Sequence, residues 1–126
     1  MTWILSAHWA LVASVWYLGN GILHDAFVII KHKGKYDREL MRLLMDGHIL
    51  ILSGVLVFIG WLMMLNKIQW GSLISLILAV FMLLYCAMIF PFLKSIGTIF
   101  ISFMLSVVCT NALLNFSNFY YSMPSH

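Results

Sequence analysis

Histidine and aspartate occur together at two places in this 126-residue sequence. His24 is followed directly by Asp25, and Asp46 lies two residues before His48. Gly34 marks a tight turn between the two pairs, so an antiparallel hairpin brings both histidines to a similar level. Two neutral imidazoles can ligate a metal or a haem iron, with carboxylates to orient them, and histidine can also relay protons. The sequence therefore predicts a candidate ligand or proton site made of His24, Asp25, Asp46 and His48.

An ordinary structural role fits the same residues. Polar side chains near a membrane surface reach water or cap helix ends. Asp46 also lies four residues after Arg42, a favourable spacing for an ion pair on a helix. The sequence contains no His-x-x-Glu-His, Glu-x-x-His or Cys-x-x-Cys-His motif, and it requires no cofactor. If a metal ion binds, His24 and His48 are its expected ligands.

A second polar group is expected near the opposite membrane surface. His8 and His24 are about 24 Å apart along one helix, so the two cannot share a mononuclear site. Asn111 and Asn115 match the depth of His8, and the three residues predict an outer polar cluster. Hydrogen bonding between helices is the ordinary role of such residues, and binding of a quinone or a lipid headgroup is the alternative.

The composition indicates an integral membrane protein. Hydrophobic residues make up 63% of the chain and charged residues 9%, whereas soluble domains contain roughly 25% charged residues. A soluble domain of this size cannot bury so much apolar surface. These figures exclude a disordered chain, a nucleic-acid-binding protein and a small secreted disulfide scaffold. Cys86 and Cys109 differ in expected depth by about 9 Å, which predicts two free thiols.

Four segments are suitable for crossing a bilayer, which requires about 20 mostly apolar residues. They are residues 3–23, 48–65, 71–93 and 96–114. Backbone polar groups must be paired within lipid, so each segment is expected to be helical. The predicted fold is an all-α, four-transmembrane-helix bundle forming one domain over residues 1–126. A charged helical hairpin, residues 24–47, connects the first two spans.

The distribution of charge predicts the orientation. Nine of the eleven charged residues lie between residues 25 and 46, including the basic residues Lys31, Lys33, Lys35, Arg38 and Arg42. Basic loops remain in the cytoplasm, so we expect residues 24–47 and 91–95 there and both termini outside, in a bacterial inner membrane. The five basic residues are candidates for contact with anionic lipid or a partner. An outer aromatic belt agrees with this orientation: Trp3, Trp61, Trp70, Tyr120 and Tyr121.

Helix signals and small residues predict how these elements pack. Asp37 is the expected N-cap of the second hairpin arm. The arms either extend the first two spans past the bilayer, which the near absence of helix breakers favours, or the second arm lies in the headgroup plane. Small residues let helices approach closely. The expected contact residues are Ser6, Ala10 and Ser14, then Gly54 and Gly60, Ser75 and Ala79, and Ser102, Ser106 and Thr110.

Three functional hypotheses follow. The first is a non-catalytic subunit or accessory protein of a larger membrane complex, which contacts other subunits or further copies of itself through its spans and hairpin. The second is a small redox or lipophile-binding protein that uses His24 and His48 to bind haem, a metal or a quinone. The third is a homo-oligomeric channel or transporter, which the absence of charged residues from the span centres disfavours.

Overall fold

All four predicted spans are helical in the computed structural model, which describes residues 2–32, 36–90 and 95–121. The helices are α1 (Thr2–Lys31), α2 (Arg38–Leu65), α3 (Trp70–Ile89) and α4 (Ile96–Tyr121). Each is long and apolar enough to cross a membrane, and the described residues contain no strand. The predicted all-α architecture with four potential membrane-spanning helices is therefore confirmed.

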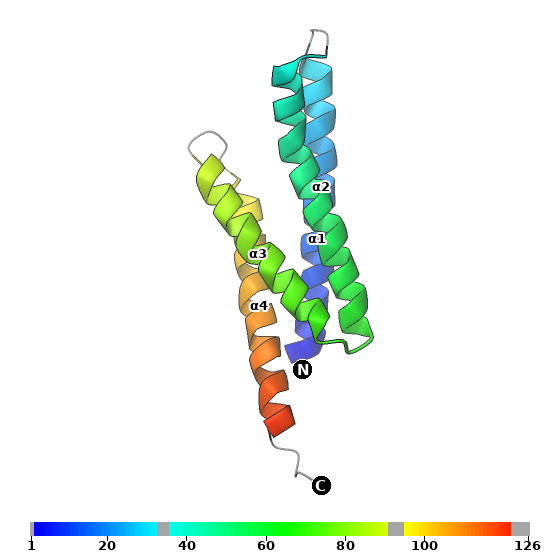
Figure 1. Cartoon of the computed structure of the whole chain (residues 1–126), viewed down its shortest axis with the longest axis vertical. Coiled ribbons are helices and arrows are strands. Elements are labelled where there is room, and N and C mark those ends of the chain that lie inside the picture. Colours follow the sequence, from blue (N-terminus) through cyan, green and yellow to red (C-terminus); the bar gives the residue numbers. More distant parts are fainter. Residues whose placement is uncertain (1, 33–35, 91–94, 122–126) are drawn as a thin grey trace.

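The helices run alternately up and down, and α4 packs against α1 to close the bundle (Figure 1). The start of α1 and the end of α4 lie at the same end of the molecule. At the other end, the α1–α2 pair extends well beyond the α3–α4 pair. Helix length explains this difference: the 30 residues of α1 span about 45 Å, whereas the 20 residues of α3 span about 30 Å.

The first two spans are longer than predicted because each is continuous with its hairpin arm. Gly47 is the one helix breaker between the second hairpin arm and the second span. In the structure it is buried inside α2 and does not interrupt the helix. The second arm is therefore collinear with its span. The expected turn at Gly34 and the expected break at Pro91 lie outside the described residues. At the opposite end of the bundle, α4 continues past residue 114 to Tyr121.

Asp37 caps α2 as predicted. Its Oδ1 accepts a hydrogen bond of 2.8 Å from the backbone N–H of Leu40. His32, which follows α1, places its Nε2 3.4 Å from the other carboxylate oxygen. The hydrogen bond from Leu40 and the nearby His32 hold the pKa of Asp37 below its ordinary value. One carboxylate thus caps α2 and connects it to the end of α1.

Small residues bring α1 and α2 into close contact. Ser6, Ala10 and Ser14 are buried, as predicted, and the hydroxyl of Ser14 donates a 2.9 Å hydrogen bond to the carbonyl of Gly54. A Cβ atom at Gly54 would lie 2.7 Å from Leu18 Cγ and 2.9 Å from Leu18 N. Because one of these neighbours is backbone, it cannot rotate away, and α1 would have to move.

The predicted contact stripe of α4 is wrong at two of its three residues. Ser102 is buried, but Ser106 is only half-buried and Thr110 is exposed. Residues spaced by four advance 40° beyond a full turn at each step and drift off a helix face. The buried side of α4 instead alternates steps of three and four residues: Ser102, Leu105, Cys109 and Ala112.

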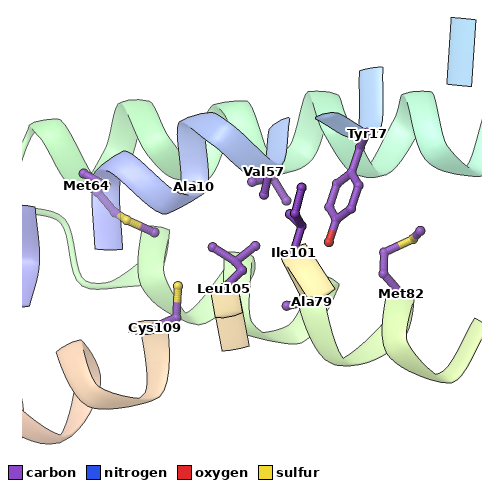
Figure 2. Packing of buried hydrophobic residues seen from close by; sticks show 11 residues of the cluster. Ala10, Tyr17, Val57, Met64, Ala79, Met82, Ile101, Leu105 and Cys109 are labelled. Carbon is purple, nitrogen blue, oxygen red and sulfur yellow. The ribbon is translucent and has the colours of Figure 1, made fainter. Parts of the chain in front are cut away.

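The core between the four helices is built largely from small and sulfur-containing side chains (Figure 2). Figure 2 shows residues of all four helices converging there: Ala10, Tyr17, Val57, Met64, Ala79, Met82, Ile101, Leu105 and Cys109. The Tyr17 hydroxyl hydrogen-bonds the Ser102 hydroxyl over 2.5 Å, so the polar end of this buried ring is satisfied. Cys86 and Cys109 are free and buried, as predicted.

Substitution at Gly54 tests whether close helix approach stabilises the bundle. We expect Gly54→Ala to lower the free energy of unfolding by about 1–3 kcal/mol because the added methyl group meets Leu18. Gly19→Ala is the control: no atom lies within 4 Å of its added Cβ, so we expect a gain of about 0.4–1 kcal/mol. Unfolding by SDS in mixed micelles measures both, and equal effects would contradict this account.

Candidate functional site

Three of the four residues of the predicted ligand or proton site lie together. The carboxyl group of Asp25 lies between two imidazoles, with its Oδ2 3.0 Å from His48 Nδ1 and its Oδ1 3.6 Å from His24 Nδ1. The side chain of Asp25 is 13% exposed, that of His24 23% and that of His48 70%. The cluster therefore has a sheltered carboxyl group at its centre and one imidazole open to its surroundings.

Two glycines make room for this carboxyl group at the contact between α1 and α2. A Cβ atom at Gly47 would overlap the carboxyl group of Asp25. A Cβ atom at Gly21 would lie 2.7 Å from the carbonyl oxygen of Gly47 and 2.9 Å from the backbone nitrogen of Ile51. The helices are thus close enough for Asp25 of α1 to reach His48 of α2.

Hydrogen bonding inside the cluster is incomplete among the described residues. His48 Nδ1 lies 2.8 Å from the carbonyl oxygen of Leu44, so Asp25 shares that nitrogen with the helix backbone. His24 Nδ1 and Asp25 Oδ1 are both buried without a hydrogen-bond partner, and their 3.6 Å separation is too long for a hydrogen bond. A small movement of either side chain would join them, which suits an imidazole that is oriented by a carboxyl group.

Asp46 does not join this cluster, so the four-residue grouping is not what the structure shows. Residues two apart on a helix project about 200° from each other, which directs Asp46 away from His48. Asp46 Oδ1 instead accepts a 2.5 Å hydrogen bond from the hydroxyl of Tyr85 on α3. No ion pair between Asp46 and Arg42 occurs in residues 2–32, 36–90 and 95–121. The two carboxyl groups therefore serve opposite faces of α2.

The described residues provide no group of three histidine, cysteine, aspartate or glutamate side chains placed to hold a metal ion. His24 and His48 meet through Asp25 and do not converge on a common point with a further ligand. The metal or haem role of the two histidines therefore stays a prediction. The carboxyl group of Asp25 can orient either imidazole, and the imidazoles can hydrogen-bond a ligand.

The residues of the predicted outer cluster are not joined to one another. His8 is exposed, and its Nδ1 lies 2.7 Å from the carbonyl oxygen of Ile4 on the same helix. Asn111 and Asn115 are exposed on α4. Within the described part of the chain, no hydrogen bond links these three side chains, so each is placed for contact with lipid or a partner.

The basic residues of the hairpin are exposed where the structure describes them. The ammonium group of Lys31 lies 4.5 Å from the centre of the Phe27 ring, a cation–π contact. Lys33 and Lys35 lie outside the described residues. Arg38 and Arg42 are exposed and line a shallow polar hollow of about 590 Å³ along the first turns of α2. Glu39 and Asp46 line the same hollow, so basic and acidic side chains alternate there, and contact of the basic residues with anionic lipid or a partner stays a prediction.

Sequence reasoning did not anticipate that the start of α4 lies beside His24. Residues of α1, α2 and the α4 start enclose a hollow of about 320 Å³ there: Trp16, Asn20, His24, Leu50, Ser95, Ile96, Gly97 and Thr98. The indole N–H of Trp16 donates to the hydroxyl of Thr98 over 3.3 Å, and a Cβ at Gly97 would lie 2.6 Å from the same indole ring. No local sequence signal joins α1 to residues 95–98, because this contact depends on the packing of the whole bundle.

Comparison with protein-family models, with curated proteins and with solved structures finds no match to this chain.

The Tyr85–Asp46 hydrogen bond can be measured by a double-mutant cycle. We expect Tyr85→Phe and Asp46→Ala to couple by about 0.6 kcal/mol and by no more than about 1.7 kcal/mol, the range for hydrogen bonds between membrane helices. SDS unfolding of the single and double variants gives the coupling. The control pair Tyr85→Phe and Asp25→Ala should be additive, and additivity in both cycles would show that the bond contributes nothing.

Proposed function

We propose that this chain is a small, non-catalytic membrane subunit that binds a larger membrane assembly through its α1–α2 hairpin. The proposal places it in a bacterial inner membrane, with residues 24–47 and 91–95 in the cytoplasm and both termini outside. The partner is another helical membrane protein. The observation that carries the proposal is the apolar surface on the two hairpin arms, residues 24–32 and 36–47.

These arms expose large apolar side chains beyond the end of α3. Ile30 is 79% exposed, and Phe27, Ile29 and Met41 are also exposed. The arms lie past the length of chain that a hydrocarbon core of about 30 Å would cover. A contiguous apolar surface in water or among headgroups is typical of a protein-binding site.

Charged side chains accompany this apolar surface. Lys31 covers part of the Phe27 ring, and Arg38, Glu39 and Arg42 are exposed on the neighbouring arm. Apolar centres with a polar edge, including arginine, are typical of protein–protein interfaces. The mixture supports binding to a protein more than simple insertion into lipid tails.

Charge and aromatic placement support the proposed orientation. The described charged residues gather on the hairpin, apart from Lys67 in the α2–α3 turn. At the opposite end, the indole of Trp3 donates a 2.8 Å hydrogen bond to the carbonyl of Met64, which brings the start of α1 beside the end of α2. Trp70 begins α3 at the same end and is exposed. Tryptophan favours a membrane interface, and basic residues favour the cytoplasm.

Cysteine labelling tests the orientation. In a background carrying Cys86→Ala and Cys109→Ala, we expect Tyr36→Cys to react with a membrane-impermeant maleimide only in inverted vesicles. Lys67→Cys should react only in intact spheroplasts. The two positions serve as controls for each other because both are exposed. Labelling of both from one side would contradict the topology, and the reverse pattern would invert it.

Purification from native membranes tests the proposed role. We expect the chain to be purified in mild detergent with a stoichiometric membrane-protein partner, and we expect the double substitution Phe27→Ser, Ile30→Ser to remove that partner. Ile68→Ser, an exposed isoleucine at the opposite end, is the control and should retain it. A wild-type chain that is purified alone as a stable monomer, or equal retention by both variants, would overturn the proposal.

A further inference from the structure

The hollow beside His24 has a polar lining at the level where the α3–α4 pair ends. His24 and Asn20 contribute from α1, and Ser95 and Thr98 from the start of α4. Trp16 and Leu50 supply its apolar walls. A hollow of about 320 Å³ with a few convergent polar groups is typical of a site for a small molecule or a headgroup.

An apolar groove adjoins this hollow along α1. The groove is a shallow, open space of about 480 Å³ on the exposed face of this one helix, lined by Leu11, Val12, Val15, Trp16, Gly19, Asn20 and Leu23. Trp16 and Asn20 line both spaces, so the groove leads directly to the polar hollow. At its centre, no atom lies within 4 Å of a Cβ added to Gly19. Together the two spaces match a molecule with one polar head and one apolar tail.

We propose that this composite site binds a lipid-soluble quinone, with the ring in the hollow beside His24 and the isoprenoid tail in the groove along α1. The inference concerns this chain alone and does not depend on the proposed role as a subunit. It assigns to α1 and the start of α4 a ligand that enters from the membrane.

The hydrogen-bonding groups of the hollow suit the oxygens of a quinone ring. His24 Nδ1 faces the carboxyl group of Asp25, which leaves the other ring nitrogen for a ligand. With Nδ1 turned toward the Asp25 carboxyl group, the neutral imidazole offers its other nitrogen as an acceptor for a hydroxyl of the quinol. The hydroxyl groups of Ser95 and Thr98 can donate to a carbonyl oxygen of the quinone. One set of side chains therefore serves both forms of the ligand.

The described residues that line the hollow are uncharged apart from the imidazole of His24. The carboxyl group of Asp25 lies 3.6 Å from His24 Nδ1, on the side of the ring that faces α2. Among the described residues, no lysine or arginine lines the hollow or the groove, although phosphate recognition commonly uses these residues.

Binding of a decyl-tailed benzoquinone to the purified full chain in neutral phospholipid nanodiscs tests the proposal. We expect saturable binding that Gly19→Leu weakens about tenfold or more, because the leucine occupies the open groove without meeting another atom. His24→Leu should weaken binding about fivefold, the typical effect of one lost hydrogen bond. Val80→Leu adds a methylene group to an exposed residue of α3 and should leave binding unchanged.

Each outcome decides the proposal. Gly19→Leu keeps the test valid even if His24→Leu fails to fold, since it adds a side chain to empty space. Absence of saturable binding, or equal binding by wild type and Gly19→Leu, would overturn the site. If phosphatidylglycerol added to the nanodiscs displaces the quinone at a few molecules per protein, the head is anionic and the assignment to quinones is wrong.

Discussion

The close approach of α1 and α2 is the constraint on which the other features depend. Gly21, Gly47 and Gly54 each lie where a Cβ atom would meet the facing helix. In a lipid environment apolar side chains gain little by leaving the solvent, so helix association depends on van der Waals packing and interhelical hydrogen bonds. The glycine contacts supply the first, and the hydrogen bond from Ser14 to the Gly54 carbonyl supplies the second.

Polar partners make two carboxyl groups tolerable near the membrane, and the close approach of α1 and α2 provides those of Asp25. An ionisable side chain in or near lipid is costly unless a polar partner accompanies it. Asp25 has His24 and His48 beside it, and Asp46 has the hydroxyl of Tyr85. Because Asp46 and His48 project from opposite faces of α2, one helix holds two separate polar contacts, toward α1 and toward α3. This division explains why a symmetrical four-residue site does not form.

The accuracy of the sequence-based predictions depended on whether each feature was local. Apolar length predicted the four helices, and the cap at Asp37 followed from residue type and position. The meeting of His24, Asp25 and His48 required only that two neighbouring helices pair at the expected register. In contrast, the position of Ser95–Thr98 beside His24 depends on how α4 packs on α1, and no residue pattern within either segment encodes it. The stripe through Ser106 and Thr110 failed for a geometric reason, the drift of a four-residue repeat around a helix.

Unequal helix length links the hairpin to the hollow. α3 ends at Ile89, about one bilayer thickness from its start, whereas α1 and α2 continue for about two to three further turns. The chain therefore returns into α4 at the level of His24, which lies seven residues before the end of α1. Beyond this level α1 and α2 pack against each other, and among the described residues their outer apolar side chains remain exposed. Because α3 ends before α1 and α2 do, the hairpin arms expose an apolar surface, and the polar hollow beside His24 lies where the α3–α4 pair ends.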